Sequence, residues 1–552
     1  MKAHLTDLLF SIVKKMTPDI SRAQIILERP KLIEHGDLSC NIALILSKKL
    51  NKAPREIAQE IVNLIPTDDV FKKIDVAGAG FLNFYLSQHS QYQTIANVIN
   101  KNKDYGKNTH GNNQKIQIEF VSANPTGPLH VGHGRGAAIG DCLARLHEFS
   151  GWEVTREFYY NDAGAQIDNL TKSISARCNN IHPDNPAFPK DGYRGEYISD
   201  IANAYLKKST IENNGITVQS NGDIFDNESI KLFAITYLRK EQDEDLQAFK
   251  TQFDVYSLES SFYTKGKVKN IVEALKKEGH TYEKDGALWL KTTTFGDDKD
   301  RVMQKSDGDY TYFVPDVAYH FDKWERGFDR VINEQGADHH STINRVRAGL
   351  QGLNKGIPIT WPEYILHQMI TVLKKGVEVK ISKRAGSYVT LKDLVDEVGC
   401  DATRYFLVAR RPDSQLVFDI DLAKSQNNDN PVYYIQYAHA RIHSVLSQWG
   451  KDLSSLKDNQ QYNYDSPFEK KLIRKIDEFP EMIETATQEL APHQVANFLK
   501  DCAADLHGYY NDTKFLVDNE DEKRGRLALI YAVQNILKNG LYLLGISAPE
   551  KM

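Results

Sequence analysis

The sequence predicts an α/β protein whose central unit is a doubly wound parallel sheet, with an α+β unit before it and an all-helical unit after it. Over residues 115–149 a strand pattern, a glycine-rich turn and a helix pattern follow one another, which is typical of the phosphate-binding end of such a sheet. Strand-like segments return after residue 300, behind a long interruption. From about residue 426 to the end, apolar residues recur at helical spacing.

The composition limits the classes of protein to which the chain can belong. Its 552 residues are too many for one hydrophobic core, and 41% hydrophobic with 26% charged residues is typical of a soluble globular protein. Apolar runs are much shorter than the ~20 residues that cross a bilayer, and the charged start lacks a signal peptide's apolar core. Five scattered cysteines without a CxxC pair argue against a disulfide framework or a cysteine-rich zinc site. We therefore expect a cytoplasmic protein, in which the net charge of -5 requires local basic surface for any polyanionic partner.

Residues 1–105 are expected to form the α+β unit. Apolar residues recur at helical spacing over 41–65, and the stretch 73–87 alternates like a strand that a glycine turn interrupts. This unit carries a slight excess of lysine and arginine, although the whole chain is acidic. The polar run 100–114 is typical of a linker and leads into the central unit.

The central unit is expected over residues 115–425. The stretch 115–120 alternates like a strand, and apolar residues then recur at helical spacing over 139–149 until Gly151 ends the helix. The next strand is expected over 152–160. A glycine-rich turn therefore joins the first strand to the first helix, where doubly wound sheets bind nucleotides.

An insertion is expected to interrupt the central sheet over about residues 165–300, where the pattern is mostly helical, polar and broken by loops. Strand-like segments at 329–335 and 363–373 indicate that the sheet resumes after it. From 426 to 552 the chain is expected to be helical. One of these helices begins with a capping box, Ser466 to Glu469, that has proline at the first helical position.

The glycine-rich turn, "NPTGPLHVGHGRG" at residues 124–136, admits four interpretations. A purely structural turn explains the glycines and prolines but not two histidines at the entrance of a helix. A zinc site of the HExxH type needs histidines four apart around a glutamate, whereas His130 and His133 are three apart and enclose Val131 and Gly132. Neither of these two interpretations accounts for the whole motif.

A dinucleotide cradle and a phosphoryl-transfer site account for more of the turn. Gly132, Gly134 and Ala137 satisfy G-x-G-x-x-A. Glu153 lies about twenty residues on, but at the start of the next strand, whereas a ribose ligand belongs at the strand's end. Alternatively, the helix N-terminus and two imidazoles supply N–H donors to a phosphate whose charge grows in a transition state. The turn alone leaves these two interpretations open.

A second motif lies about 250 residues further along the chain. Residues 380–384, Lys-Ile-Ser-Lys-Arg, are in isolation typical of a solvated basic loop. This loop is short, however, and the stretch from Thr390 to Asp393 is a cap-like entry to another helix. A loop with two lysines can close over a polyphosphate and withdraw after pyrophosphate leaves. The second motif therefore favours phosphoryl or nucleotidyl chemistry over hydride transfer.

The two motifs together resemble those of a known enzyme class. HVGH at 130–133 is similar to the HIGH signature, and KISKR at 380–384 to the KMSKS signature, of class I aminoacyl-tRNA synthetases. Flanking stretches such as "EFVSANPTGPLHVGH", "YYNDAGAQI", "SDGDYTYFVPDVAYH" and "NPVYYIQYAHAR" resemble arginyl-tRNA synthetases of the bacterial kind, over essentially the whole chain. The resemblance implies a class I Rossmann-like catalytic domain at 115–425, an N-terminal α+β domain that contacts tRNA at 1–105, and an all-α anticodon-binding domain at 426–552.

The resemblance also implies a reaction and its partners. The carboxylate of arginine attacks the α-phosphate of ATP to give arginyl-adenylate and pyrophosphate, and the 2′-OH of the terminal tRNA adenosine then attacks the activated carbonyl. The implied partners are L-arginine, ATP and tRNA(Arg). Mg²⁺ is expected to arrive with ATP, because no protein metal cage is visible in the sequence. The family further implies a monomer that activates arginine only when tRNA is bound.

For ATP, the resemblance assigns roles to both motifs. The side chains expected to contact and neutralise the phosphates, and so to be catalytic, are His130, His133, Lys380 and Lys383. Gly132 would let adenine pack on the backbone, and the expected ATP site is completed by Ser382, Asp338 and His339. Taken alone, Asp-His-His at 338–340 is also typical of a metal-dependent phosphoesterase, but the further Asp and His clusters of that class are not evident.

Recognition of arginine needs an acceptor that matches a flat guanidinium with five donors. The resemblance assigns this role to Asp316, with Tyr312 one helical turn earlier on the same side. Asn124 and Glu119, beside the first motif, would hold the head of the amino acid and neighbouring polar atoms. Taken alone, an aspartate that follows Pro315 is more commonly a helix cap.

Contacts with tRNA are expected in both outer units. Tyr434 and Tyr437 are expected to offer rings to unstacked anticodon bases, and Arg441 a phosphate or packing contact. In the N-terminal unit, Asn83 and Phe84 are the candidates for contact with the corner of the tRNA. The alternatives are tyrosines that pack between helices and, for Phe84, a core position in a strand.

Overall fold

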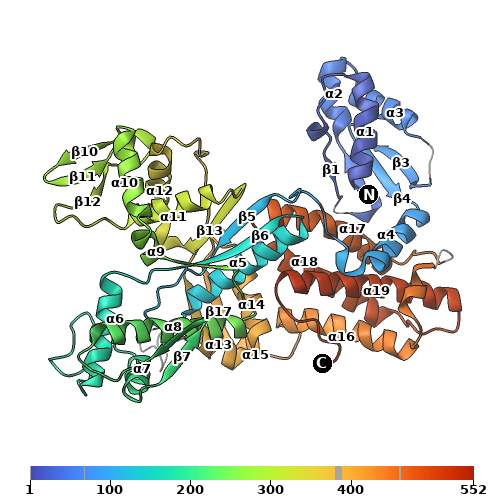
Figure 1. Cartoon of the computed structure of the whole chain (residues 1–552). Coiled ribbons are helices and arrows are strands. Elements are labelled where there is room, and N and C mark those ends of the chain that lie inside the picture. Colours follow the sequence, from blue (N-terminus) through green and yellow to red (C-terminus); the bar gives the residue numbers. More distant parts are fainter. Residues whose placement is uncertain (1, 31, 67–68, 380–387, 459–461) are drawn as a thin grey trace.

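The computed structural model describes residues 2–30, 32–66, 69–379, 388–458 and 462–552. It shows an N-terminal α+β unit, a central α/β unit and a C-terminal helical unit in chain order (Figure 1). The predicted fold class is confirmed, because the central unit is built on a parallel sheet and the described chain beyond Pro431 is helical.

The N-terminal unit packs helices against an antiparallel sheet with the strand order β1-β2-β4-β3. Its elements are α1 (Lys2–Met16), β1 (Leu27–Glu28), β2 (Leu38–Cys40), α2 (Ile42–Leu50), α3 (Pro54–Leu64), β3 (Phe71–Ala77) and β4 (Phe81–Leu86). The stretch 41–65 forms two helices rather than one. Asn51 takes a left-handed φ of 51°, and Pro54 is suited to the first turn of a helix but not to its interior.

Helix α4 (Gln88–Lys101) lies before the unit boundary expected at residue 105, but it does not belong to the core of the N-terminal unit. The core of the N-terminal unit extends only to Phe84, whereas apolar residues of α4 belong to the core that includes the C-terminal helices. Just beyond α4, the carbonyl oxygen of Tyr105 accepts a hydrogen bond of 3.2 Å from Nδ2 of Asn539. The segment expected to close the first unit therefore packs against the end of the chain, because an amphipathic helix must bury its apolar face against some partner surface.

The central sheet is parallel and has the strand order β14-β13-β5-β6-β9. Its strands are β5 (Lys115–Glu119), β6 (Glu153–Tyr160), β9 (Val255–Leu258), β13 (Arg330–Gly336) and β14 (Glu363–His367). Helix α5 (Val131–Phe149) follows β5 and packs on β6 and β13, and α11 (Phe313–Glu325) packs on α12 (His340–Gly352). Because parallel strands end at one edge of the sheet, the turns after β5, β13 and β14 meet there.

The insertion expected over 165–300 is divided by strand β9, which joins the central sheet beside β6. Its first part contains α6 (Ala165–Cys178), α7 (Glu196–Leu206), β7 (Thr210–Asn213), β8 (Ile216–Gln219) and α8 (Asn227–Ala248). Its second part contains α9 (Glu259–Thr264), α10 (Lys267–Lys277), β10 (Thr281–Lys284), β11 (Ala287–Leu290) and β12 (Arg301–Gln304). Figure 1 shows both parts on the side of the sheet away from the helical unit. The sequence did not indicate β9 because this short, half-buried edge strand has no alternation of apolar and polar residues.

The apolar stretch expected as one segment at 363–373 forms two strands in different sheets. β14 belongs to the central sheet, whereas β15 (Ile370–Lys374) pairs with β16 (Val377–Glu378) and β17 (Leu416–Asp419). The short helices α13 (Leu391–Val398), α14 (Cys400–Val408) and α15 (Ile420–Lys424) then lead towards the helical unit.

The C-terminal unit consists of long helices packed side by side (Figure 1). They are α16 (Pro431–Trp449), α17 (Pro467–Gln488), α18 (His493–Asp512) and α19 (Glu520–Leu543). The predicted capping box at the start of α17 is confirmed. The backbone N–H of Ser466 donates to Oε2 of Glu469 (3.1 Å), and the Ser466 hydroxyl accepts from the N–H of Phe468 (3.3 Å).

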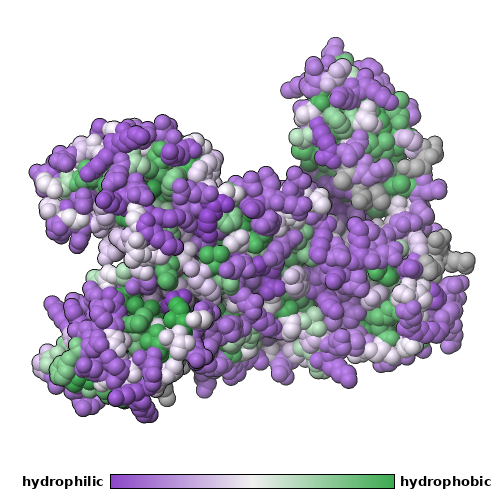
Figure 2. Space-filling model, viewed as in Figure 1, coloured by the Kyte–Doolittle hydropathy of each residue, from purple (hydrophilic) through white to green (hydrophobic). Residues whose placement is uncertain are grey.

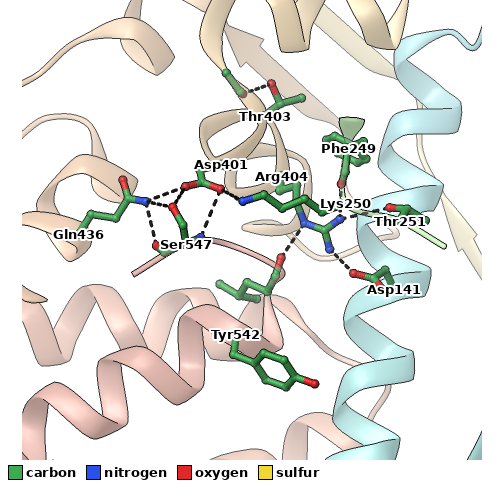
Figure 3. Close-up of polar contacts among 12 residues, drawn as sticks. Asp141, Phe249, Lys250, Thr251, Asp401, Thr403, Arg404, Gln436, Tyr542 and Ser547 are labelled. Atoms are coloured by element: carbon green, nitrogen blue, oxygen red, sulfur yellow. Dashed lines mark hydrogen bonds and ion pairs between the residues drawn. The ribbon is translucent and has the colours of Figure 1, made fainter. Parts of the chain in front are cut away.

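A buried polar cluster around Arg404 of α14 fastens the helical unit to the central unit (Figure 3). Its guanidinium donates to the carbonyl oxygens of Leu544 (2.9 Å) and Phe249 (2.8 Å) and to the carboxylate of Asp141 in α5. Gly545 is required beside it, because φ is +67° and an added Cβ would overlap the guanidinium. One side chain therefore joins the end of the first insertion part, the C-terminal segment and the helix that follows the glycine-rich turn.

The face of the molecule seen in Figure 2 is mainly hydrophilic, with apolar side chains in small groups. In the described part of the chain, no helix combines the length and the apolar character needed to cross a membrane.

Candidate active site

The connection from β5 to α5 begins with strained backbone. Val121 and Ser122 have φ values of 69° and 40°, a region that β-branched residues such as valine rarely adopt. The Ser122 hydroxyl donates to Oε1 of Glu119 (2.8 Å) and accepts from the backbone N–H of Tyr159 (3.2 Å), so both neighbouring strands hold it. Such conformations cost about 1–3 kcal/mol each and are concentrated at functional sites.

His130 and His133 form a reciprocal cap at the start of α5. Nδ1 of His130 accepts from the backbone N–H of His133 (3.2 Å), and Nδ1 of His133 accepts from the N–H of His130 (3.3 Å). The two rings are stacked, with centroids 3.6 Å apart. Because a backbone amide can only donate, each Nδ1 must carry a lone pair, and the proton of each neutral ring lies on Nε2. Each ring therefore presents an N–H donor away from the backbone.

Both imidazoles are neutral at physiological pH. Burial lowers the pKa of His130 to about 4, with a smaller contribution from His367. Burial also lowers the pKa of His133 well below its ordinary value, and His130 adds to this effect. The N-terminus of α5 acts in the same direction, because the helix dipole disfavours a cation there. The pair therefore supplies hydrogen-bond donors rather than positive charge.

Gly132 lies directly beside the stacked histidines. A Cβ atom at this position would lie 2.8 Å from Cε1 and 2.9 Å from Nδ1 of His130. A side chain here would crowd the His130 imidazole, and the packing of adenine on the Gly132 backbone stays a prediction. Glycine is needed here first of all so that the imidazole pair can form.

Residues 389–391, a few positions beyond the second motif, are hydrogen-bonded to the first motif. The backbone N–H of Val131 donates to the carbonyl oxygen of Val389 (3.0 Å), and the N–H of Leu391 donates to that of Leu129 (2.8 Å). These bonds form a short antiparallel bridge between the start of α5 and the start of α13. The start of α13 is therefore anchored at the first motif, although the two lie about 250 residues apart in the sequence.

The second motif itself, with Lys380, Ser382, Lys383 and Arg384, lies outside the described residues. The helix predicted to follow the motif is present as α13. The Thr390 hydroxyl caps this helix by accepting from the backbone N–H of Asp393 (3.0 Å), as the cap-like sequence indicated.

On the other side of the histidine pair, the ends of β13 and β14 contribute Glu334 and His367. Nδ1 of His367 lies 2.5 Å from Oε1 of Glu334, and Glu334 is buried. Asp338 and His339, expected on the ribose side, lie in an exposed turn directly after β13. Burial dominates the pKa of His130, but Asp338 opposes it, which places this carboxylate within electrostatic reach of the imidazole pair.

A cavity of about 480 Å³ lies between the first motif and the first part of the insertion. From the first motif and the turn before it, its lining includes Asn124, His130 and His133. From the insertion it includes Tyr193, Arg194 and Tyr197, which sequence reasoning did not identify. Their one signal was the dense glycine and tyrosine pattern of "GYRGEY" within an otherwise polar stretch.

Nearby, carboxylates outnumber cations around Asp316, in the first turn of α11. Burial, together with the charges of Glu259 and Glu119, raises the pKa of Asp316 to about 7, although Lys323 opposes this effect. Burial also raises the pKa of Glu259. Lys323 is the cation of the group; its Nζ donates to Oε2 of Glu119 (2.6 Å) and to Oδ1 of Asn333 (2.8 Å). An added guanidinium would relieve the excess of negative charge.

The other two residues expected around arginine border this carboxylate group and the cavity. Tyr312 lies directly before α11 and is 76% exposed. The side-chain amide of Asn124 donates to Oε1 of Gln166 in α6 (2.7 Å), a residue that the sequence did not single out. Asn124 lies in the lining of the cavity, whereas Tyr312 presents its ring to solvent.

Two observations concern the metal and the dinucleotide interpretations of the glycine-rich turn. In the ranges that the structure describes, no group of three or more histidine, cysteine, aspartate or glutamate residues is arranged to hold a metal ion. Glu153 is the first residue of β6 and pairs with Lys115 at the start of β5. It therefore lies at the edge of the sheet opposite the turn, where it cannot bind a ribose held at that turn.

The two tRNA candidates of the N-terminal unit are buried, which corrects the expectation for them. Phe84 is 0% exposed, and its ring centroid lies 5.3 Å from that of Phe71. Asn83 is 5% exposed and accepts from the hydroxyl of Ser39 (2.9 Å). Both side chains are occupied inside the unit and offer no surface to RNA, because Phe84 points into the core and Asn83 pairs across the sheet.

The candidates on α16 belong to a row of stacked groups. The ring of Tyr437 is stacked on that of Tyr433, with centroids 5.9 Å apart. The guanidinium of Arg441 lies 4.6 Å from the ring centroid of Tyr437 and 4.5 Å from that of Tyr510 in α18. Tyr434 instead packs against His507 of α18, at 4.3 Å between centroids. Arg441 is therefore held flat between two partly exposed rings, a contact that sequence spacing did not show.

Comparison with known proteins agrees with this geometry along the whole chain. Residues 3–86 match the family described as arginyl tRNA synthetase N terminal domain, 94–421 that of tRNA synthetases class I (R), catalytic domain, and 435–552 the DALR anticodon binding domain. The chain is 56% identical to Arginine--tRNA ligase of Geotalea uraniireducens (strain Rf4), over 96% of this chain and 95% of that protein. It is 52% identical to the enzyme of that name from Bordetella avium (strain 197N), over 100% and 99%.

A solved structure shares the fold. It is the arginyl-tRNA synthetase of Thermus thermophilus, at 22% identity and a TM-score of 0.77, with 100% of both chains covered. Sequence, fold and site geometry thus agree, and the chain belongs to the arginyl-tRNA synthetase family.

Proposed function

We propose that this protein attaches L-arginine to tRNA(Arg) in an ATP-dependent reaction that passes through arginyl-adenylate. A carboxylate oxygen of arginine attacks the α-phosphorus of ATP, and the bond to the departing pyrophosphate breaks. The 2′-oxygen of the terminal adenosine then attacks the carbonyl carbon of the adenylate, and AMP leaves. The observation that carries the proposal is the backbone bridge that anchors the exit of the second motif at the capped start of α5, beside the cavity.

On the ATP side, the imidazole pair and the second motif divide the work. His130 and His133 donate through Nε2 to phosphate oxygens, at the positive end of the α5 helix dipole. Lys380 and Lys383, with Ser382, neutralise the pyrophosphate as it departs. Mg²⁺ enters bound to ATP, and Asp338 with His339 lines the ribose side.

On the arginine side, Asp316 and Glu259 receive the guanidinium. Two carboxylates of raised pKa in one buried place match a planar group with five donors better than either does alone. Both oxygens of Glu119 already accept from Ser122 and Lys323, so Glu119 acts through its charge. Asn124 holds the head of the amino acid from the cavity side, and Tyr312, directly before α11, contributes an exposed ring that can contact bound arginine.

The outer units bind the tRNA. The anticodon loop meets α16 and α18, where Tyr437 and Arg441 form the stacked row and offer an aromatic surface to unstacked bases. The N-terminal unit meets the corner of the tRNA through its exposed surface. The protein acts as a cytoplasmic monomer away from membranes; its five free cysteines suit a reducing compartment, and light scattering should give a mass near 62.7 kDa.

The proposal is tested by incubating the protein with a tRNA pool, ATP and each amino acid in turn. Arginine alone should form an acid-precipitable ester with tRNA. Charging with a different amino acid, or ATP consumption without an ester, would overturn the proposed reaction. Arginine-dependent ATP–pyrophosphate exchange should in addition require tRNA, and robust exchange without any tRNA would contradict that part.

The role of Asp316 is tested separately. Asp316→Asn should raise the KM for arginine at least tenfold, because a charge-assisted contact of about 1.5–3 kcal/mol is lost, and should leave the KM for ATP within about twofold. Asp322→Asn is the matched control: it lies in the same helix, is partly buried, and pairs with Arg326 (3.1 Å) and with Lys267. Equal effects of Asp316→Asn on both KM values would show that the guanidinium partner is another residue.

A further inference from the structure

The turn before the first motif is held by side chains from outside it. Gln242 of α8 donates through Nε2 to the carbonyl oxygens of Asn124 (3.1 Å) and Gly127 (2.8 Å). Gln242 is only 1% exposed. Since both neighbours can only accept, the orientation of its amide is fixed, with the NH₂ group towards the turn. The amide thus ties two points of the turn to the insertion.

Two tyrosines hold the rest of the turn in the same way. The hydroxyl of Tyr197 in α7 donates to the carbonyl oxygen of Thr126 (2.9 Å), and that of Tyr388 donates to the carbonyl oxygen of Pro128 (3.0 Å). Burial raises the pKa of both phenols, so both remain neutral donors. Tyr388 lies four residues after Arg384, so side chains of the insertion and of the segment before α13 both hold the turn.

The turn has little structure of its own to replace these bonds. Within residues 124–128, the backbone hydrogen bond found in the described structure is the one from the N–H of Thr126 to the carbonyl oxygen of Asn124 (2.8 Å). Pro125 and Pro128 have no N–H to donate. The shape of this segment is therefore set by Gln242 and the tyrosines rather than by local backbone pairing.

The position of the turn matters because it separates the two halves of the reaction centre. Asn124 lies at one end of the turn, and the His130–His133 cap follows its other end. The cap is fixed independently by its bridge to the start of α13. A shift of the turn therefore moves Asn124 relative to the imidazole pair without moving the pair itself.

We propose that Gln242 and Tyr197 are positioning residues of the insertion. They set the distance between the group that holds the head of arginine and the groups that hold the phosphates of ATP. This inference rests on the proposed assignment of Asn124 to arginine. It gives the first part of the insertion a function in amino-acid activation, besides any contact with tRNA, since misplacing reacting groups by about 1 Å can cost on the order of 100-fold in rate.

The test compares conservative variants in steady-state aminoacylation. Tyr197→Phe removes one donor, and Gln242→Met removes two donors at nearly constant volume. Each should raise the KM for arginine and lower kcat, so that kcat/KM for arginine falls roughly tenfold, with the larger fall for Gln242→Met. The KM for ATP should stay within about twofold. A merely structural role would lower the concentration of active enzyme, measured by active-site titration, and leave both KM values unchanged.

Matched controls come from the same two helices. Tyr205→Phe in α7 removes a hydroxyl that donates to Oδ1 of Asn221 (2.7 Å) and to the carbonyl of Asp223 (2.9 Å), inside the insertion. Thr236→Val in α8 removes a buried hydroxyl bonded to the carbonyl of Leu232 (2.8 Å). Both controls should lower the unfolding temperature and keep the KM values of the unchanged enzyme.

The outcomes separate this inference from the proposed function. If Asn124→Ala raises the KM for arginine and Gln242→Met and Tyr197→Phe do not, the positioning role is overturned and the assignment of Asn124 stands. If Asn124→Ala leaves the KM for arginine unchanged, that assignment falls, and the positioning role falls with it. The inference is supported when all three variants share the same KM signature and the controls do not.

Discussion

Replacing Asp141 should destabilise the junction between the central and helical units. Its side chain is 3% exposed and that of Arg404 is 0% exposed, so the pair is shielded from water (Figure 3). Asp141 also accepts from Arg145 (2.8 Å) and lies 3.7 Å from Arg156. Asp141→Asn would leave these guanidinium groups around an uncharged amide. Removing one partner of a buried pair costs about 3–5 kcal/mol. We expect the lower end, about 3 kcal/mol, because Arg404 keeps its bonds to Leu544 and Phe249.

The size of the effect on the unfolding temperature follows from the size of the cooperative unit. The core that contains the C-terminal helices also contains residues of α5 and α14, so we expect the two units to unfold as one cooperative unit of about 450 residues, with an unfolding entropy of about 1 kcal/mol/K. A loss of about 3 kcal/mol then lowers Tm by about 3 °C, measured by differential scanning calorimetry. The control is Glu273→Gln, which breaks an exposed pair with Lys269 (3.7 Å) and should leave Tm unchanged. A Tm for Asp141→Asn within 1 °C of that control would refute the reasoning.

The pH dependence gives a second check on the same variant. Burial by itself raises the pKa of Asp141, but Arg404 and Arg145 outweigh it, and the net pKa lies below the ordinary value. A carboxyl with a lowered pKa contributes stability above its unfolded pKa, and the contribution is lost as pH falls below that value. The gap in Tm between the protein and Asp141→Asn should therefore be constant from pH 8 to 5 and shrink only below about pH 4. A gap that shrinks between pH 7 and 5 would show that the carboxyl is not held by these cations.

Three further predictions concern the reaction and the tRNA. Gly132→Ala should displace the His130 imidazole, because the new Cβ would lie 2.8 Å from Cε1; we expect kcat for ATP–pyrophosphate exchange to fall roughly tenfold or more at little change in Tm. The KM for arginine should fall as pH rises through about 7, because Asp316 must ionise to bind a guanidinium; a flat profile between pH 6 and 8 would contradict this. Arg441→Ala should raise the KM for tRNA several-fold, because the ring of Tyr437 loses the guanidinium packed against it, and should leave the KM for arginine unchanged. A KM for tRNA equal to that of the unchanged protein would show that this surface does not bind tRNA.

The sequence predicted well those features that depend on residues close together in the chain. The strand, glycine-rich turn and helix at 115–149 and the capping box at Ser466 each depend on residues within a few positions of one another, and each has the expected structure. The same holds for the alternating strands on either side of the glycine turn near residue 78. Where local propensity and tertiary packing agree, the pattern alone is sufficient.

The sequence was insufficient where packing against a distant part of the chain determines the structure. Helix α4 has an ordinary amphipathic pattern, which shows that one face is buried but not which unit buries it. β9 is visible as a strand only beside β6, because pairing rather than alternation defines it. Phe84 and Asn83 were proposed for RNA contact, but in β4 they face the core and the neighbouring strand.

The sequence predicted the motifs of the candidate site but not the side chains that hold these motifs in place. The first motif was found because its residues are adjacent in the chain. Gln242, Tyr197 and Glu259 come from separate elements, and only Tyr197 has a local signal, the glycine and tyrosine pattern of 192–197. Their roles depend on contacts between residues 71 or more positions apart in the sequence, and such contacts are specified by the packed fold.

The protonation state of the imidazole pair is consistent with catalysis by differential binding. A permanent cation at the start of α5 would oppose the helix dipole and would bind the phosphates of free ATP as strongly as those of the reacting complex. In the proposed mechanism, neutral His130 and His133, fixed as Nε2–H donors by their reciprocal cap, form hydrogen bonds that strengthen as negative charge grows on the phosphate oxygens. In the proposed mechanism, net positive charge comes instead from the lysines of the second motif. A cap that is rigid and uncharged, combined with charge on a separate segment, thus favours the transition state over bound ATP.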